Sequence, residues 1–295
     1  MSLIPICFLS INTPVDLSLI SIGSCLSATD NEIFVGFTEL ADIKSFPDNP
    51  RIKLIDLSAD ADKLGISKGS YKDFSQEEFF QLVQLKWILI SKVMAISDSK
   101  YVQYCDLDVL WISNPSDHIV ETFNNHPFAE ILIQDASTDP SLPDLCMGYC
   151  AFRNSASTKQ MLSELQLLHK NFLETNPFLG DDDVVTEYYR NSRDLRIVRL
   201  PQVTFPVGNM GLLYSGKSYF PGVKAPTPYI FHANFVIGAR RKVEYLLMLR
   251  KRYRLEIDAI TGLRFQQYGI TRMLRIFKFR VLAVLHVYRN SEPLI

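Results

Sequence analysis

The sequence lacks several features that would assign it to a structural class at once. Its 295 residues include only five cysteines, which are scattered and form no Cys-x-x-Cys pair. This excludes a disulfide framework and argues against a structural zinc site. No basic segment precedes the apolar residues near the N-terminus, and no run of about 18 uncharged apolar residues occurs. We therefore expect no signal peptide and no bilayer-spanning helix, and a reducing cytoplasmic setting fits best.

Several catalytic motifs are also missing. The glycine-rich patterns GxGxxG and GxxxxGK[ST] do not occur, which argues against a dinucleotide-binding enzyme or a P-loop ATPase. The patterns GxSxG and HExxH are absent too. If the chain is an enzyme, its chemistry has to come from residues that are not marked by these signatures.

The chain does have ample material for a core, because 47% of its residues are hydrophobic and only 21% are charged. Apolar runs predict strands at residues 4–11, 32–38, 52–57, 101–112, 129–134, 146–153, 195–200 and 229–234. Helices are predicted at residues 16–27, 75–97, 155–173 and 181–189, the second of them starting at a Ser75 capping box. This alternation predicts an α/β fold with a central sheet flanked by helices, in a single domain.

Two carboxylates stand at the end of one predicted strand. Side chains on a strand alternate between its faces, so Asp106 and Asp108 point the same way and Leu107 points away. Two carboxylates at this spacing can reach one hard divalent cation, and ligands bind at the carboxyl ends of strands in open α/β sheets. We therefore predict a Mg²⁺ or Mn²⁺ site. The alternative is a turn in which the aspartates cap backbone amides.

The segment that contains Asp106 and Asp108 resembles a known family. The segment SKVMAISDSKYVQYCDLDVLWISNP is similar to the core of the GT-A-fold nucleotide-diphospho-sugar transferases, above all retaining families eight and seventy-seven. Further segments are similar to family motifs in the same order: Cys146-Met147-Gly148 to Ser155, Gly180 to Asp183, Phe205 to Gly208, and His232-Ala233-Asn234 with Gly238 and Lys242. The resemblance covers residues 75–245 and implies a Rossmann-like mixed sheet.

The resemblance also implies a role for several residues. His232, at the end of an apolar strand, is expected to be a third metal ligand, although a lone histidine there is more often a core residue. Lys242 after Gly238 is expected to bind the diphosphate, and Asp182 or Asp183 to orient the donor sugar or the acceptor hydroxyl. Gly148, Arg153 and Asn234 are expected to line the donor or acceptor, and Lys86 either meets the nucleotide or lies along its helix with its charge in water.

Two positions depart from the family pattern. Cys146 replaces the asparagine of the family's Asn-x-Gly segment, and Asp182 stands where a glutamine is usual. The resemblance implies an enzyme that transfers a sugar from a nucleotide-diphosphate donor, expected to be a UDP-sugar, to a glycan, lipid-linked or protein acceptor with retention of configuration. No nucleic-acid partner is expected. Two other readings stay open at this stage: a haloacid-dehalogenase-like phosphohydrolase with Asp106 as nucleophile, and a non-catalytic carbohydrate- or nucleotide-binding module.

The C-terminal part of the chain is basic, whereas the rest of the chain is acidic. Residues 239–290 have a net charge of +10 and the rest of the chain a net charge of −11. We expect a transferase domain at residues 1–245 and a basic helical extension at 246–295. Residues 264–289 mix basic and apolar side chains, as in helices that lie on an anionic membrane surface or pack on another domain or copy. The first alternative predicts peripheral contact with the inner membrane face, which liposome flotation would test.

Overall fold

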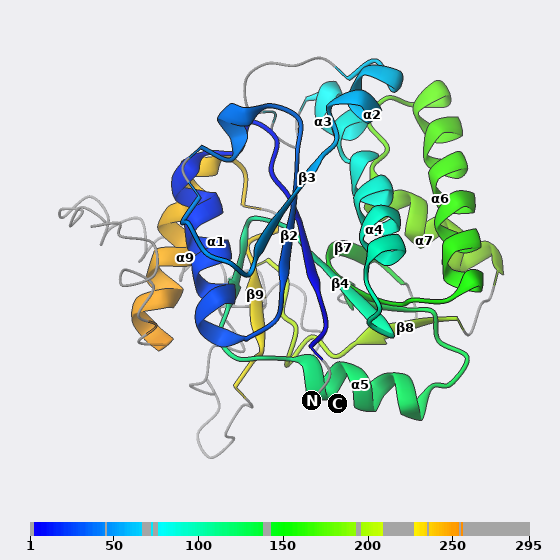
Figure 1. Cartoon of the computed structure of the whole chain (residues 1–295). Coiled ribbons are helices and arrows are strands. Elements are labelled where there is room, and N and C mark those ends of the chain that lie inside the picture. The colour runs from blue at the N-terminus through cyan, green and yellow to red at the C-terminus, as the bar shows by residue number, and fades with distance from the viewer. Residues whose placement is uncertain are drawn as a thin grey trace, which may run out of the picture.

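A seven-stranded sheet forms the centre of the computed structural model (Figure 1). Its strand order is β3-β2-β1-β4-β7-β6-β8. All neighbours are parallel except β7, which runs antiparallel to both β4 and β6. The strands are β1 (Ile6–Leu9), β2 (Ile33–Phe37), β3 (Ile52–Asp56), β4 (Tyr101–Cys105), β6 (Ile131–Asp135), β7 (Leu145–Arg153) and β8 (Ile197–Leu200). The structure describes residues 3–44, 46–66, 72, 76–137, 143–192, 196–208, 227–234, 236–253 and 255.

Helices cover both faces of this sheet, as the predicted α/β class requires. Helices α4 and α6 pack against each other on one side of the sheet, and α1 and α9 pack against each other on the opposite side (Figure 1). The helices are α1 (Val15–Ala28), α2 (Ser58–Lys63), α3 (Glu77–Leu82), α4 (Leu85–Ile96), α5 (Ser116–Asn125), α6 (Ala156–Thr175), α7 (Asp181–Ser192) and α9 (Ala239–Tyr253), with a 3₁₀ turn at Leu40–Asp42. Helices α2 and α5 were not predicted, because both are short and largely polar.

Buried strands explain the apolar runs in the sequence. Strands β1, β2 and β4 are buried at every residue, as expected for central strands covered on both faces. Helix α6 begins as predicted at Ser155, whose hydroxyl accepts a hydrogen bond from the Thr158 backbone N–H at 3.0 Å. All five cysteines are free and buried, so they act as small core side chains.

The predicted strand at residues 101–112 is wrong in one respect, because it is two strands. After β4 the chain leaves the main sheet at Asp106 and forms β5 (Val109–Trp111), which pairs with β9 (Ile230–His232) in a separate two-stranded sheet. The Asp106 N–H still bonds to the Gly148 carbonyl at 2.8 Å, while the Asp108 carbonyl accepts from the Ala233 N–H at 2.9 Å. The two aspartates therefore lie on the turn that joins the two sheets.

The single helix predicted at residues 75–97 is also divided. Helices α3 and α4 are separated by a turn at Val83 and Gln84, and the predicted cap Ser75 lies outside the described residues. Within the described part of the chain, one stretch, Glu77–Ile96, is long and apolar enough by composition to cross a membrane, contrary to our expectation. Most of its apolar window is buried, and Trp87, Leu89 and Val93 are fully buried in the core, as in a core helix.

Helix α9 crosses the predicted boundary between residues 245 and 246. Beyond that boundary, Leu246 and Leu249 are buried in a cluster with Leu17 and Ile20 of α1. The first turns of the basic region thus pack on the rest of the domain. The basic stretch at residues 264–289 lies outside the described residues, so its membrane contact stays a prediction.

Candidate active site

The turn after β4 brings two carboxylates to one histidine. Strand β9 pairs with β5 so that His232 lies opposite Val109, next to Asp108. One ligand atom from each of Asp106, Asp108 and His232 lies within 4.8 Å of the others. The His232 Nε2 atom is 3.1 Å from Asp108 Oδ1 and 4.0 Å from Asp106 Oδ2. The three predicted metal ligands, which come from two distant segments, therefore converge in the structure.

Gly148 makes room for the histidine ring. A Cβ atom at this position would lie 1.8 Å from His232 Cε1, which no side chain can tolerate. We predicted Gly148 to line the donor or acceptor, but the space that a side chain would fill at this position is occupied by the ring of His232, a candidate metal ligand. Its role here is to let the buried imidazole, only 3% exposed, sit against β7.

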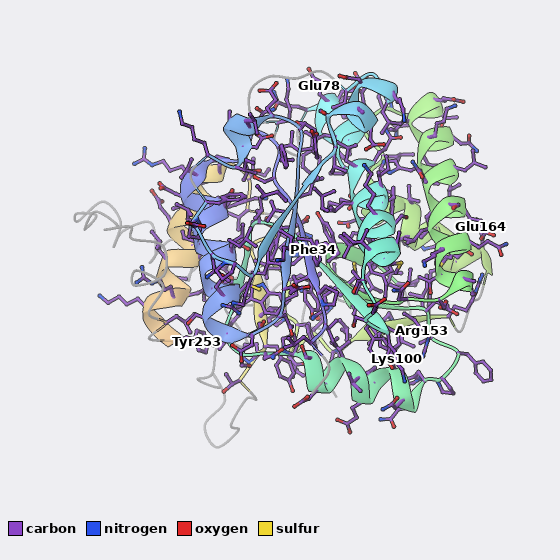
Figure 2. All side chains as sticks on the ribbon, in the orientation of Figure 1. Phe34, Glu78, Lys100, Arg153, Glu164 and Tyr253 are labelled. Carbon is purple, nitrogen blue, oxygen red and sulfur yellow. The ribbon has the colours of Figure 1, made fainter. Side chains whose placement is uncertain are left out.

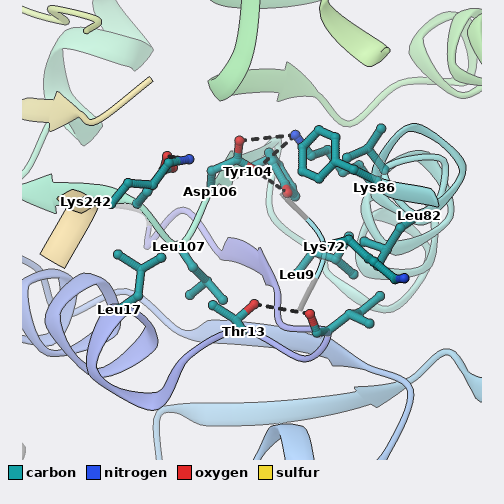
Figure 3. Close-up of a pocket in the computed structure, with 14 residues that line it drawn as sticks. Leu9, Thr13, Leu17, Lys72, Leu82, Lys86, Tyr104, Asp106, Leu107 and Lys242 are labelled. Carbon is teal, nitrogen blue, oxygen red and sulfur yellow. Dashed lines mark hydrogen bonds and ion pairs between the residues drawn. The ribbon is translucent and has the colours of Figure 1, made fainter. Parts of the chain in front are cut away.

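The buried ammonium group of Lys86 binds Asp106. The Lys86 Nζ atom lies 3.0 Å from Asp106 Oδ1, and the Tyr104 hydroxyl donates to the same oxygen at 2.7 Å (Figure 3). Lys86 Nζ also lies 2.6 Å from Asp181 Oδ2. Burial alone would lower the pKa of Lys86, but the Asp106 and Asp181 carboxylates outweigh burial and raise it well above its usual value. Lys86 is therefore charged, and its ammonium group pairs with these two carboxylates rather than lying in water.

A second lysine holds Asp108. Gly238 has a φ of +95°, a conformation that glycine adopts without strain, and its carbonyl accepts from the Lys242 N–H as α9 begins. The Lys242 Nζ atom lies 2.7 Å from Asp108 Oδ2. Burial would raise the pKa of Asp108, but Lys242 and His232 outweigh it and hold that pKa well below its usual value. Asp108 is thus a carboxylate throughout the neutral range.

The two predicted catalytic aspartates differ in their surroundings. Asp182 accepts a hydrogen bond from the Met147 N–H at 2.6 Å, and burial together with the neighbouring Asp181 raises its pKa well above the usual value. Asp183 is exposed and accepts from the Gly180 N–H at 2.8 Å, which caps the start of α7. Both aspartates line the same cleft as Asp106 and His232.

Arg153 does not join the site. It pairs with Tyr101 at the far end of β4, beside α5 (Figure 2). Its guanidinium donates to the carbonyls of Ala129 and Phe123, at 2.8 and 3.3 Å, and lies over the Phe123 ring. We predicted that Arg153 lines the donor or acceptor. The structure places it away from Asp106 instead, because β7 runs antiparallel to β4 and carries Arg153 to the end of β4 where that strand begins.

Asn234 and Cys146 lie together beside the histidine. The Asn234 amide donates to Cys146 Sγ at 3.1 Å, and both residues line the cleft. Burial raises the pKa of the Cys146 thiol well above its usual value, so the sulfur is a neutral thiol. The replacement of asparagine by cysteine thus leaves a small, weakly polar group at this wall of the cleft.

Two adjoining hollows meet at the aspartates. One, of about 610 Å³, extends toward the end of β1 and is lined mainly by apolar side chains such as Leu9, Leu17 and Leu82 (Figure 3). The other, of about 860 Å³, extends toward α7 and is lined by Asp182, Asp183 and Asn234. Asp106, Asp108, Lys86, Lys242 and Phe79 line both.

The residues fit a divalent cation. Carboxylate oxygens are ligands for Mg²⁺ and Mn²⁺, and one imidazole nitrogen suits Mn²⁺. The His232 ring is also hydrogen-bonded through Nδ1, at 3.1 Å from Gln134 Oε1, which leaves Nε2 facing the carboxylates. Such support of the second ring nitrogen is typical of histidines that bind metals.

Three residues of the site were not predicted. Tyr104 lies two positions before Asp106, and the period of two in a strand could have placed it on the same face. Asp181 lies in the Gly180 to Asp183 segment of the resemblance but was not singled out, and Gln134 carried no local signal, because their partners Lys86 and His232 are about a hundred residues away in the chain.

Comparison with solved structures identifies the fold. Glycosyltransferase GlyE of Streptococcus pneumoniae TIGR4 is 12% identical with a TM-score of 0.55, and the alignment covers 89% of this chain and 63% of GlyE. Mouse xyloside xylosyltransferase 1 is 15% identical with a TM-score of 0.52, covering 79% of this chain and 98% of the enzyme. Galactosyltransferase LgtC is 11% identical with a TM-score of 0.56, covering 83% and 96%. At these identities the likeness shows the fold alone, which is the GT-A fold of glycosyltransferases.

Sequence comparison names the family. The nucleotide-diphospho-sugar transferase family matches residues 59–246, well over half of the chain. A search of curated proteins finds no match. The chain belongs to the nucleotide-diphospho-sugar transferase family and is a glycosyltransferase, as the resemblance in the sequence predicted.

Proposed function

We propose that this glycosyltransferase uses a divalent cation, Mn²⁺ or Mg²⁺, and transfers a sugar from a UDP-sugar to an acceptor hydroxyl with retention of configuration. One observation carries the proposal: Asp106, Asp108 and His232 converge at the junction of two hollows, with a lysine on each side. A diphosphate at that junction would have its nucleoside in one hollow and its sugar in the other.

Each residue has a task in this proposal. Asp106, Asp108 and His232 would hold the cation, which when bound neutralises charge on the departing diphosphate. Lys242 would exchange its contact with Asp108 for a diphosphate oxygen, because a phosphate offers its ammonium an equally charged partner. Lys86 would keep Asp106 in place.

Asp182 is the candidate for contact with the sugar. Its raised pKa favours the protonated carboxyl, which can donate a hydrogen bond to a sugar hydroxyl or to the acceptor. Asp183 would maintain the start of α7 that presents Asp182 to the cleft. Retention of configuration rests on the resemblance to families eight and seventy-seven.

The phosphohydrolase alternative is not favoured. It requires Asp106 to attack a phosphorus atom, yet Lys86 and the Tyr104 hydroxyl both bind this carboxylate and would weaken it as a nucleophile. A non-catalytic module would need no cation site flanked by two lysines. The family match supports transfer over both alternatives.

Release of nucleoside diphosphate from a panel of sugar nucleotides, with and without Mn²⁺, tests the proposal. We expect metal-dependent release that is fastest with a UDP-sugar, and a loss of about 100-fold or more in Asp108→Asn, because the transition-state charge loses its support. Asp98→Asn is the matched control, since Asp98 is exposed and precedes the opposite end of β4. Equal release without metal, or an active Asp108→Asn, contradicts the proposal.

A further inference from the structure

Gln134 links the candidate metal ligand His232 to the backbone of Phe205, in the loop whose residues Pro206 and Gly208 also bond to the His232 backbone. It is fully buried on β6. The β6–β7 pairing shifts register here, from Ile133 opposite Cys150 to Gln134 opposite Cys146, so β7 bulges between these pairs. Bulges redirect side chains, and this one opens space at Gly148 for the histidine ring beside the Gln134 amide.

The orientation of the Gln134 amide follows from its partners. Its Nε2 atom donates to the Phe205 carbonyl at 3.1 Å, and a backbone carbonyl can only accept. The NH₂ group must therefore point to Phe205, and the amide oxygen must point the other way. That oxygen lies 3.1 Å from His232 Nδ1.

An amide oxygen fixes the proton on the ring nitrogen that faces it. Because Gln134 Oε1 can only accept, His232 Nδ1 has to carry the hydrogen of this contact. The other nitrogen, Nε2, then faces Asp106 and Asp108, and its lone pair becomes available when a cation takes the place of the hydrogen that Nε2 shares with Asp108. This is the nitrogen that a cation between the aspartates would use.

The other neighbours of the ring do not supply this hydrogen bond. Cys146 Sγ lies farther from Nδ1, at 3.6 Å, and a thiol sulfur is a weak acceptor. Gly148 gives space but no polar side chain. Among these contacts, Gln134 is therefore the one that holds the hydrogen on Nδ1 and fixes the tilt of the His232 ring.

We infer that Gln134 is a positioning residue for the cation site, acting by accepting a hydrogen bond from His232 Nδ1 and so aiming Nε2 between Asp106 and Asp108. This inference rests on the proposed function only in requiring that a divalent cation binds there. No residue of the GT-A resemblance in the sequence pointed to Gln134.

Titration of the metal-free protein with Mn²⁺ alone, followed by electron paramagnetic resonance, tests the inference without any sugar donor. Removing a hydrogen-bond partner of a metal-binding histidine typically weakens metal affinity by about 10- to 100-fold. We expect a loss of this size in Gln134→Leu, and a weaker or absent hyperfine coupling between Mn²⁺ and an imidazole nitrogen in the pulsed spectrum.

Gln103→Leu is the matched control. Gln103 is an equally buried glutamine on β4, which β7 separates from β6, and its amide oxygen accepts from the Tyr149 hydroxyl. It should lose stability as Gln134→Leu does, yet keep wild-type Mn²⁺ affinity and nitrogen coupling. A similar loss of affinity in both variants would overturn the inference, since the cause would then be general damage to the core.

Gln134→Glu provides the conservative rescue, because a carboxylate also accepts from Nδ1. We expect Mn²⁺ affinity within a few-fold of wild type and a retained nitrogen coupling. If Gln134→Leu binds Mn²⁺ like wild type, the positioning role is wrong while the proposed function stands. If the wild-type protein binds no Mn²⁺ at this site, the metal dependence of the proposed function fails, and the inference fails with it.

Discussion

Replacing Gly148 by alanine should disable the cation site through a single methyl group. The added Cβ would lie 1.8 Å from His232 Cε1, 2.3 Å from Nδ1 and 2.5 Å from Nε2. Carbon atoms in contact are about 3.5 Å apart, so the ring or the strand has to move by roughly 1.7 Å. The ring has little freedom to move, because it is buried and hydrogen-bonded to Gln134.

This displacement is large for metal binding. Ligand distances in metal sites tolerate deviations of about 0.2 Å, so His232 Nε2 would leave coordination range. We expect Gly148→Ala to lower Mn²⁺ affinity by more than about 100-fold, which is beyond the loss of a supporting hydrogen bond. Overpacking of a core typically costs about 1–3 kcal/mol, so the free energy of unfolding should fall by that amount or more.

Urea unfolding and Mn²⁺ titration measure both effects, with Gly36→Ala as the control. The Cβ added at Gly36 would crowd methyl groups of Leu57 and Leu89, at 2.8 and 3.0 Å, on β2 and away from the cation site. Gly36→Ala should therefore lose stability and keep its Mn²⁺ affinity. The difference between the two variants separates a displaced ligand from a crowded core.

A double substitution shows whether the clash is with His232 itself. In a His232→Ala background the alanine at position 148 would fill the space that the ring has left, so the further loss of stability should nearly vanish. An equal loss in both backgrounds would mean that Gly148→Ala acts elsewhere. Wild-type stability and Mn²⁺ affinity in the single variant would refute the reasoning outright.

Two further predictions concern buried titratable groups. Lys86→Met should lower the free energy of unfolding, measured in urea, by about 3–5 kcal/mol, because Asp106 and Asp181 lose the lysine that they share. Adding Asp181→Asn should recover part of the loss, and an unchanged stability in Lys86→Met would contradict the ion pairs. Stability should also fall as the pH drops below about 6.5, because burial lowers the pKa of His169 and the unfolded chain then binds the proton that the folded chain refuses. His169→Gln should flatten that dependence in urea unfolding at several pH values, and an unchanged slope would count against it.

Much of the fold could be predicted from the sequence because its signals are local. Residues 4–11 and 32–38 are apolar in every position that becomes β1 and β2, and burial on both faces requires that composition. Ser155 marks the start of α6 by a cap that depends only on the next three residues. The resemblance around Asp106 and Asp108 was sufficient to identify the family, which the match to residues 59–246 confirmed.

The errors have a common physical cause. The chain from Tyr101 to Ile112 is apolar enough for one strand, and nothing local shows that Asp106 turns it from the main sheet to β9. Arg153 was expected in the site because the segment from Cys146 to Ser155 resembles a family motif that lines the donor and acceptor. The antiparallel direction of β7 instead carries Arg153 to the other end of the sheet, where it binds backbone carbonyls.

The sequence by itself determined which chemical groups are available: a carboxylate pair after a buried strand, a histidine at the end of another, and lysines on two helices. Only the tertiary structure decided what these groups do to one another. Lys86 neutralises Asp106 and Asp181, Lys242 neutralises Asp108, and Gln134 orients His232, in pairs separated by 20 to 134 positions in the chain. Hydrogen bonds and ion pairs act over about 3 Å, so such partners are set by strand order and register, which no local pattern in the sequence records.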